Sequence, residues 1–265
     1  DGTTRTIRPP ATSKNVISVG ETYKKNYELA TITGEKINVG EDQVTLTSSK
    51  GLVQTDEIVI FKPDIVAPGA YTCSAQFGNF LEDLQRFDSN IKLCVDSEHV
   101  YGLGTSAAAP IVSGAAALLL QAHPGLSPLQ VKTALKNTVR IVDDKLQFQG
   151  RGLIDISKAL SLNSYPEVEL NPLGNAKGNT LDITGTAQGE QIAYTLYYKE
   201  LPKEYKTGGI TFTPGPQEIA LLSITQLNSK DGWIQLYTSN NAADNSTIYK
   251  WSIEGLKHEK YLIKL

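Results

Sequence analysis

The chain has 265 residues, of which 40% are hydrophobic and 20% charged, so it can form one large folded domain or two smaller ones. Its 25 Lys and Arg residues nearly balance its 28 Asp and Glu residues, and the charges are scattered along the sequence. This pattern argues against a nucleic acid or an anionic membrane as partner, and the longest apolar runs are too short to predict a membrane span.

The first part of the chain alternates predicted strands with predicted helices. The β-branched run NVISVG (15–20) predicts a short buried strand, and DEIVIFKPDIVAPG (56–69) predicts a second strand region interrupted by Pro63. The segment 107–120 carries Ala and Leu on all sides, which predicts a central, buried helix. LSPLQVKTALKNTV predicts another helix, capped by Ser127. This alternation indicates an α/β domain.

The pattern changes near Asn163. Short alternating segments rich in Tyr, Ile, Thr and Trp follow, among them LDITGTA, YTLYYK, IALLSITQL, WIQLYT and YLIKL. Gly, Asn and Pro separate them, which is typical of an all-β antiparallel sandwich. We therefore predict an α/β domain over residues 1–162 and a β-sandwich accessory domain over residues 163–265.

The two cysteines, Cys73 and Cys94, lie in one polar segment. A disulfide between them would close a surface loop and contribute about 3 kcal/mol by the chain-entropy relation. The sequence leaves a bridge and two free thiols equally open. We expect no metal site here, because only His99 is nearby and no Cys-x-x-Cys pair occurs.

The stretch YGLGTSAAAP places Ser106 at the start of the predicted helix. A helix amino terminus offers unpaired backbone N–H groups and a partial positive charge, which would stabilise an oxyanion forming beside the serine oxygen. Gly104 permits unusual backbone angles, and the alanines leave space for a substrate. From these residues alone, the alternative is that Ser106 merely caps a helix.

The surrounding motifs decide between these interpretations. GTSAAAP and the helix sequence after it resemble the nucleophile region of the subtilisin-like serine proteases. Further segments agree with that family in the same order: the strand SKNVISVG, the turn SSKG (48–51), KPDIVAPG (62–69) and GRGLIDISKAL (150–160). The resemblance covers about residues 1 to 160. It implies a partial subtilisin-like parallel-sheet domain.

The resemblance also implies roles for single residues. Ser106 would be the acylating nucleophile, and its own backbone N–H would be one oxyanion donor. Gly104, Thr105 and Pro110 match the motif around it. Ala107 departs from the pattern, because family members commonly have methionine there, packed behind the nucleophile. This exchange changes local packing and does not by itself exclude catalysis.

The base that would activate Ser106 is expected outside this chain. In the family the catalytic Asp and His lie far upstream of the serine, and the oxyanion Asn immediately precedes the position of Asp1. We therefore expect an amino-terminal fragment of the same protease to supply all three, and this chain alone to be inactive. Of the local histidines, His99 is the one candidate base worth testing, His123 is expected to cap a helix end, and His258 lies in the predicted sandwich.

Other site residues follow from the resemblance with less support. Thr12 and Ser13, in the loop before the first strand, would lie near the floor of the S1 pocket. The insertion 77–100 would overhang the cleft, where it could select substrates or restrict access; that it is only a surface loop is an equally open alternative. No cofactor is identified; a structural calcium ion is possible, but no carboxylate cluster of calcium-loop spacing supports one.

Together these features predict a secreted or cell-surface serine endopeptidase that cleaves protein or peptide substrates through an acyl-enzyme on Ser106. The triplet Asn245-Ser246-Thr247 matches a glycosylation acceptor and gives slight support to secretion. The alternative is a pseudoprotease scaffold or an adhesion module, in which the sandwich binds protein or glycan.

Overall fold

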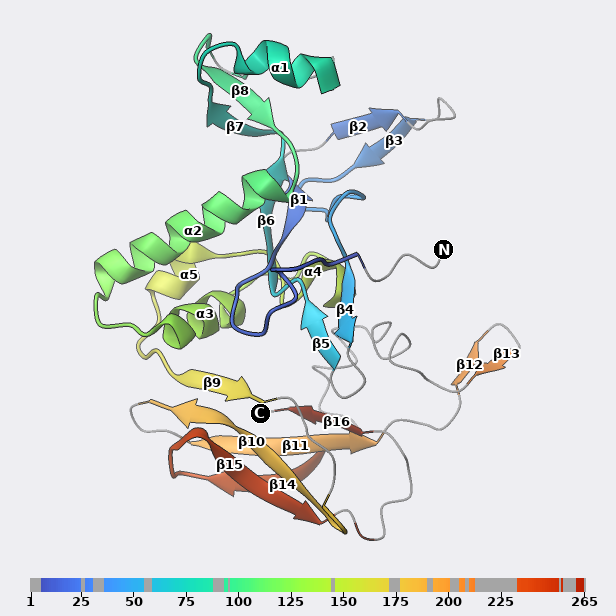
Figure 1. Ribbon diagram of the computed structural model, residues 1–265, viewed down its shortest axis with the longest axis vertical. Coiled ribbons are helices and arrows are strands. Elements are labelled where there is room, and N and C mark those ends of the chain that lie inside the picture. Colours follow the sequence, from blue (N-terminus) through green and yellow to red (C-terminus); the bar gives the residue numbers. More distant parts are fainter. Residues whose placement is uncertain are drawn as a thin grey trace.

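The structure is a computed structural model (Figure 1). It describes residues 6–24, 27–30, 36–54, 59–87, 93–94, 96–143, 146–171, 177–189, 193–200, 205–207, 210–212, 233–252, 254 and 261–264. The helices are α1 (Phe80–Phe87), α2 (Thr105–Ala122), α3 (Pro128–Asn137), α4 (Leu146–Gln149) and α5 (Ile156–Leu160). The strands of the first part are β1 (Val19–Tyr23), β2 (Tyr27–Ala30), β3 (Lys36–Val39), β4 (Gly51–Gln54), β5 (Val59–Lys62), β6 (Ile65–Ala70), β7 (Thr72–Ala75) and β8 (His99–Gly102). Those of the second part are β9 (Glu167–Leu170), β10 (Thr180–Gln188), β11 (Tyr194–Glu200), β12 (Tyr205–Thr207), β13 (Ile210–Phe212), β14 (Ile234–Ser239), β15 (Ala243–Ser252) and β16 (Tyr261–Lys264).

A parallel pair, β1 and β6, forms the centre of the first part, with Val19 opposite Ile65. β6 is buried on both faces, as strands of parallel sheets usually are. Ile65 and Ala67 belong to the main core cluster, which also contains residues of α2, α3 and α5. Val66, which points to the other face, belongs to a second cluster with Val44. The predicted combination of parallel strands and helices is therefore present.

The predicted strands differ from the observed ones at their ends. β1 begins at Val19 rather than at Asn15, because the backbone N–H of Ser18 bonds to the Asp64 carboxylate (2.8 Å) instead of entering a strand ladder. The predicted region 56–69 forms two strands, β5 and β6, because Pro63 between them has no N–H to donate.

Helix α2 packs one face against β1 and β6 and leaves another face exposed. Its buried residues are Ala108, Val112, Ala115 and Leu119. Leu118 and Leu120 are 49% and 41% exposed, so the prediction of a helix buried on all sides is wrong for this chain. By length and composition α2 is apolar enough to cross a membrane, with mean hydropathy 1.4 and 22% of its residues buried. Core helices of soluble proteins also reach this length and hydropathy, so these two properties do not by themselves indicate a membrane span.

The predicted helix after Ser127 is confirmed as α3. The Ser127 hydroxyl accepts from the Gln130 N–H (3.1 Å), and the Gln130 side chain accepts from the Ser127 N–H (2.8 Å). This reciprocal capping box, with Pro128 at the first helical position, fixes where α3 begins. Helix α5 begins in a similar way, since the Asp155 carboxylate accepts from the Lys158 N–H (3.0 Å).

The described residues between β6 and α2 include two strands and a helix where the sequence predicted a long loop. β7 and β8 form an antiparallel pair, and α1 lies between them in sequence, at the top of Figure 1. Cys73 of β7 is bonded to Cys94 by a disulfide, with the two Cα atoms 5.9 Å apart. Of the two possibilities that the sequence left open, the structure therefore has the bridge.

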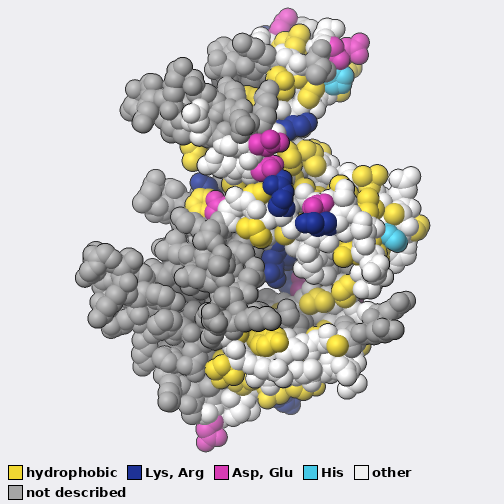
Figure 2. All heavy atoms as spheres, turned by 180° about the vertical axis from the view of Figure 1, so that it is seen from behind, with side chains coloured by type: hydrophobic (Ala, Val, Ile, Leu, Met, Phe, Trp, Pro, Cys, Tyr) yellow, Lys and Arg dark blue, Asp and Glu magenta, His cyan; other side chains and the backbone are white. Residues whose placement is uncertain are grey.

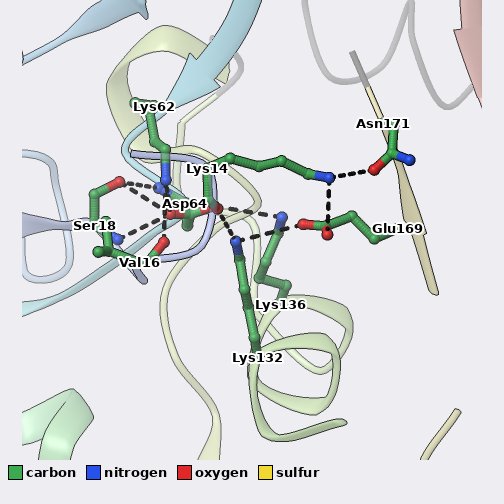
Figure 3. Close-up of polar contacts among 9 residues, drawn as sticks. All are labelled: Lys14, Val16, Ser18, Lys62, Asp64, Lys132, Lys136, Glu169 and Asn171. Atoms are coloured by element: carbon green, nitrogen blue, oxygen red, sulfur yellow. Dashed lines mark hydrogen bonds and ion pairs between the residues drawn. The ribbon is translucent and has the colours of Figure 1, made fainter. Parts of the chain in front are cut away.

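A buried cluster of charged side chains lies beside the main core (Figure 3). The Lys62 ammonium is 2.5 Å from one oxygen of Asp64, and that oxygen also accepts from the N–H and hydroxyl of Ser18 (2.8 and 3.0 Å). Lys136 of α3 is 3.4 Å from the other oxygen. Burial acts to raise the pKa of Asp64, but the Lys136 charge and the bonds from Lys62 and Ser18 outweigh it and hold that pKa below its usual value.

The same cluster reaches the second part of the chain through Glu169 of β9. The Lys14 ammonium is 3.1 Å from Glu169 and 2.5 Å from the Asn171 side chain, and Lys132 of α3 is 3.7 Å from Glu169. Burial lowers the pKa of Lys132. Figure 3 shows Lys132 projecting from its helix toward Glu169. Charged side chains thus connect α3 to β9.

The second part contains two antiparallel three-stranded sheets, in the orders β15-β10-β9 and β14-β11-β16. Ile183 of the first sheet and Leu196 of the second are buried in one apolar cluster with Trp251. The ring centres of Trp251 and Tyr198 are 5.0 Å apart. Most of the predicted segments coincide with these strands; the segment 219–227 lies outside the described residues.

Seen from behind (Figure 2), the surface of the described residues carries basic and acidic side chains close to one another. Hydrophobic side chains are spread between them. The view shows charges of mixed sign along the middle of the molecule rather than a large field of one sign.

Candidate active site

The candidate active site is built on the turn between β8 and α2. Gly104 has φ 98° and ψ 165°, a backbone conformation that residues with a Cβ rarely adopt. It is the N-cap of α2, and no side chain of its own can cap the helix. The Gly104 carbonyl accepts from the Ala107 N–H (2.9 Å), which closes the first turn. The glycine therefore allows the chain to turn sharply from the strand into the helix.

Ser106 lies in that first turn and is exposed. The first N–H groups of a helix lack the usual acceptors four residues earlier in the helix, so the Ser106 N–H lies at the positive end of the helix dipole. Pro110 follows four residues later in α2 and has no N–H, so the Ser106 carbonyl lacks its usual helical donor. These are the positions that the sequence predicted for a nucleophile and an oxyanion donor.

A buried glutamate, Glu21 of β1, lies beneath this turn and is 1% exposed. One of its carboxylate oxygens accepts from the Gly104 N–H (2.7 Å). The other accepts from the hydroxyls of Thr45 (2.8 Å) and Thr47 (3.1 Å). Glu21 was not predicted as a site residue, although an acidic side chain directly after the apolar run NVISVG is a signal that could have indicated it.

Gly69 of β6 makes the close approach of these groups possible. A Cβ on Gly69 would lie 2.7 Å from the Glu21 side chain and 2.8 Å from the Gly104 carbonyl oxygen. Both distances are shorter than any van der Waals contact, so only glycine fits here. Three separate segments, β1, β6 and the turn before α2, are thereby packed together around the start of the helix.

Comparison with known proteins assigns this chain to a family. Residues 1–165 match the Subtilase family (Peptidase_S8), which is more than half of the chain. The chain belongs to the subtilase family. The family is one of serine proteases, and the role of Ser106 as nucleophile stays a prediction.

Individual subtilases match over different lengths. Serine protease AprX of Bacillus subtilis (strain 168) is 34% identical over 159 residues, which cover 59% of this chain and 32% of that protein. Subtilisin-like protease SBT3.4 of Arabidopsis thaliana is 28% identical over 237 residues, which cover 84% of this chain and 27% of that protein. The chain thus spans about a third or less of these relatives.

Solved structures of similar proteins include MycP1 from Mycobacterium smegmatis and fervidolysin from Fervidobacterium pennivorans. MycP1 is 25% identical with a TM-score of 0.36, and the match covers 59% of this chain and 33% of the MycP1 chain. Fervidolysin is 21% identical with a TM-score of 0.41, and the match covers 81% of this chain and 28% of the fervidolysin chain. The family assignment rests on the sequence match.

Neither described histidine of this subtilase bonds to Ser106. The Nδ1 atom of His99 is 2.8 Å from the Asp96 carboxylate, and this bond is the main cause of the lowered pKa of Asp96. His123 is the C-cap of α2, where its backbone N–H bonds to the Leu119 carbonyl. Its ring packs against the ring of Tyr165, with the two ring centres 4.7 Å apart. Its predicted capping role is confirmed. His258 lies outside the described residues.

The remaining predicted residues make no contact with Ser106 among the described hydrogen bonds and ion pairs. Thr12 and Ser13 lie in the turns before β1, and their place in a substrate pocket stays a prediction. The insertion carries an open hollow of about 370 Å³, lined by Ala75, Gln76, Gly78, Ser97, Glu98 and His99. Among the residues that the structure describes, no group of three or more His, Cys, Asp or Glu side chains is arranged to hold a metal ion.

Proposed function

We propose that this subtilase chain carries the nucleophile of a serine endopeptidase. The observation that carries the proposal is the exposed Ser106 on the first turn of α2, directly after the positive-φ residue Gly104. In this geometry the hydroxyl and the helix N–H groups can reach the same carbonyl group of a substrate. Membership of a serine protease family supports the same chemistry.

The proposed reaction is hydrolysis of a peptide bond through an acyl-enzyme. The Ser106 oxygen bonds to the carbonyl carbon while its proton passes to a histidine. The resulting oxyanion accepts from the Ser106 N–H and from an asparagine side chain. The histidine then returns the proton to the leaving amine as the peptide bond breaks, and water releases the acyl group by the same steps.

We propose that an upstream segment of the same protease supplies the catalytic Asp and His and the oxyanion Asn. The exposed face of α2 supports this. It contains Ala109, Pro110, Ser113, Gly114, Ala117, Leu118 and Gln121. A stripe of small and apolar residues at helical spacing is suited to pack against another element. The matched part is about a third of serine protease AprX, which supports the proposal of such an element; without it we expect this chain to be inactive.

Residues 163–265 are proposed to be a β-sandwich accessory domain rather than a second catalytic unit. The shared cluster of Ile183, Leu196 and Trp251 supports two sheets packed face to face. The match to the Arabidopsis subtilase extends into this part. Its role is proposed to be packing against the protease domain, and the ion pairs of Glu169 support that.

We propose a secreted or cell-surface location. The disulfide between Cys73 and Cys94 supports an oxidising compartment, because cytosolic thiols are kept reduced. The substrate class proposed is protein or peptide, which follows from the chemistry of the acyl-enzyme.

The test is labelling of the protein, together with its upstream segment, by a fluorophosphonate probe. Modification of Ser106, mapped by mass spectrometry and absent in Ser106→Ala, supports the proposal that Ser106 is the nucleophile of a serine endopeptidase. The same chain without the upstream segment is expected to label at a rate lower by about three orders of magnitude or more. Absence of labelling in the complete protein refutes the proposed endopeptidase activity and favours the alternative of a pseudoprotease scaffold.

A further inference from the structure

Glu21 carries a buried carboxyl group that neutral donors hold. Its side chain is 1% exposed, and no Lys, Arg or His among the described residues forms an ion pair with it. A buried carboxylate is costly unless hydrogen bonds satisfy it. Here neutral donors do so: one backbone N–H and two threonine hydroxyls. The arrangement gives the carboxylate a fixed orientation.

The segment that carries Thr45 and Ser48 is itself hydrogen-bonded to β1. The Thr45 N–H bonds to the Glu21 carbonyl (3.0 Å), and the Glu21 N–H bonds to the Ser48 hydroxyl (3.0 Å). Ser48 in turn donates its N–H to the Thr45 hydroxyl (3.1 Å). Both the backbone and the carboxylate of Glu21 are therefore held by one segment, which leaves the other carboxylate oxygen aimed at Gly104.

The Gly104 N–H is the group that this oxygen holds. Gly104 is the N-cap of α2 and receives no side-chain cap from its own neighbours. A carboxylate at a helix amino terminus is stabilised by the helix dipole, and hydrogen bonds to charged acceptors are stronger than neutral ones. Gly104 is thus held by Glu21 through its N–H and by Ala107 through its carbonyl.

We propose that Glu21 is a positioning residue for Ser106. By fixing the peptide plane that enters Gly104, it sets the positive φ of that residue and the direction of the N–H and hydroxyl of Ser106, two residues later. This inference rests on the proposed function of Ser106. It adds to that function a residue from β1 that does not touch the substrate and that acts through the backbone.

The test compares three variants in the complete protease. Glu21→Ala removes the acceptor, whereas Glu21→Gln keeps an oxygen that can accept from Gly104 and loses only the charge. Asp155→Ala is the matched control, because Asp155 also accepts an N–H at the start of a helix, at α5. If the alanine variant does not fold, Glu21→Met keeps the side-chain length without the acceptor.

We expect Glu21→Ala to lower kcat and the rate of fluorophosphonate labelling by about 10- to 100-fold, because small displacements of a reacting group have effects of this size. KM should change little, since no substrate contact is removed. Glu21→Gln should restore most of the rate, and Asp155→Ala should label like the wild type. Hydrogen exchange of the Gly104–Ser106 amides should become faster in Glu21→Ala alone.

Unchanged kcat and labelling in a folded Glu21→Ala protein would overturn the proposal, and so would a glutamine variant as slow as the alanine one. Failure of the proposed function is distinguishable, because the wild type itself would then resist labelling. In that case the exchange of the Gly104 amide decides the inference: unchanged exchange in Glu21→Ala refutes the positioning contact, and faster exchange supports it.

Discussion

The buried pair of Lys62 and Asp64 allows a quantitative prediction about stability. Lys62 is fully buried and donates to Asp64 and to the Val16 carbonyl (3.1 Å). Asp64→Asn leaves the ammonium buried without a countercharge at hydrogen-bond distance, which should lower the free energy of unfolding by about 3 kcal/mol. Lys62→Met leaves Asp64 with both donors of Ser18, so its cost should be smaller, about 2 kcal/mol.

The double variant separates the pair from its surroundings. If the two side chains stabilise one another, the double variant Lys62→Met/Asp64→Asn should lower the free energy of unfolding by about 3 kcal/mol rather than by the sum of the single costs. In the double variant neither charge of the pair is buried without the other. Urea unfolding at neutral pH measures the three variants and the wild type. Additive single costs, within about 0.5 kcal/mol, would refute the coupling inferred from the short contact.

The pH dependence gives the same prediction a second check. Because the pKa of Asp64 is lowered on folding, its contribution is complete above the unfolded value near 3.8 and is lost as the pH falls through the lower folded value. The stability difference between wild type and Asp64→Asn should therefore stay constant from neutral pH down to about pH 5 and close below about pH 4. A difference that closes already near neutral pH contradicts the assignment.

Three further predictions concern other contacts. Replacing Cys73 and Cys94 by serine should lower the free energy of unfolding by about 3 kcal/mol, because the disulfide closes a loop with a sequence separation of 21 residues. Ser127→Ala should cost about 1 kcal/mol in thermal or urea unfolding, since it removes the cap of α3. Gly69→Ala should cost about 1 to 3 kcal/mol and slow fluorophosphonate labelling, because the new Cβ collides with Glu21.

Each of these has a control in the same chain. Reductant should destabilise the wild type but not the double serine variant. Ser127→Asn, which can still cap, should recover most of the loss. Gly125→Ala meets no atom within 4 Å and should leave both stability and labelling nearly unchanged. A Gly69→Ala protein with wild-type stability would show that the close packing around Glu21 is not rigid.

Much of the site could be predicted from the sequence because its signals are local. Ser127 and Pro128 lie within the first turn of the helix that they start, and Ser127 caps it as the sequence predicted; the reciprocal bond from the Gln130 side chain was not predicted. Gly104 and Ser106 likewise belong to one short turn. The exposed face of α2 could not be predicted in this way, because composition alone does not distinguish a helix covered on all sides from one covered on a single face.

The ordered motifs of the sequence by themselves determined the family, and residues adjacent in the chain determined the nucleophile candidate and the start of α3. Tertiary structure decided what holds that nucleophile. Glu21 bonds to Gly104 across 83 residues of sequence, and Ser18 bonds to Asp64 across 46. Such contacts depend on which strands lie side by side and on how closely glycine allows them to approach, and no local pattern encodes that geometry.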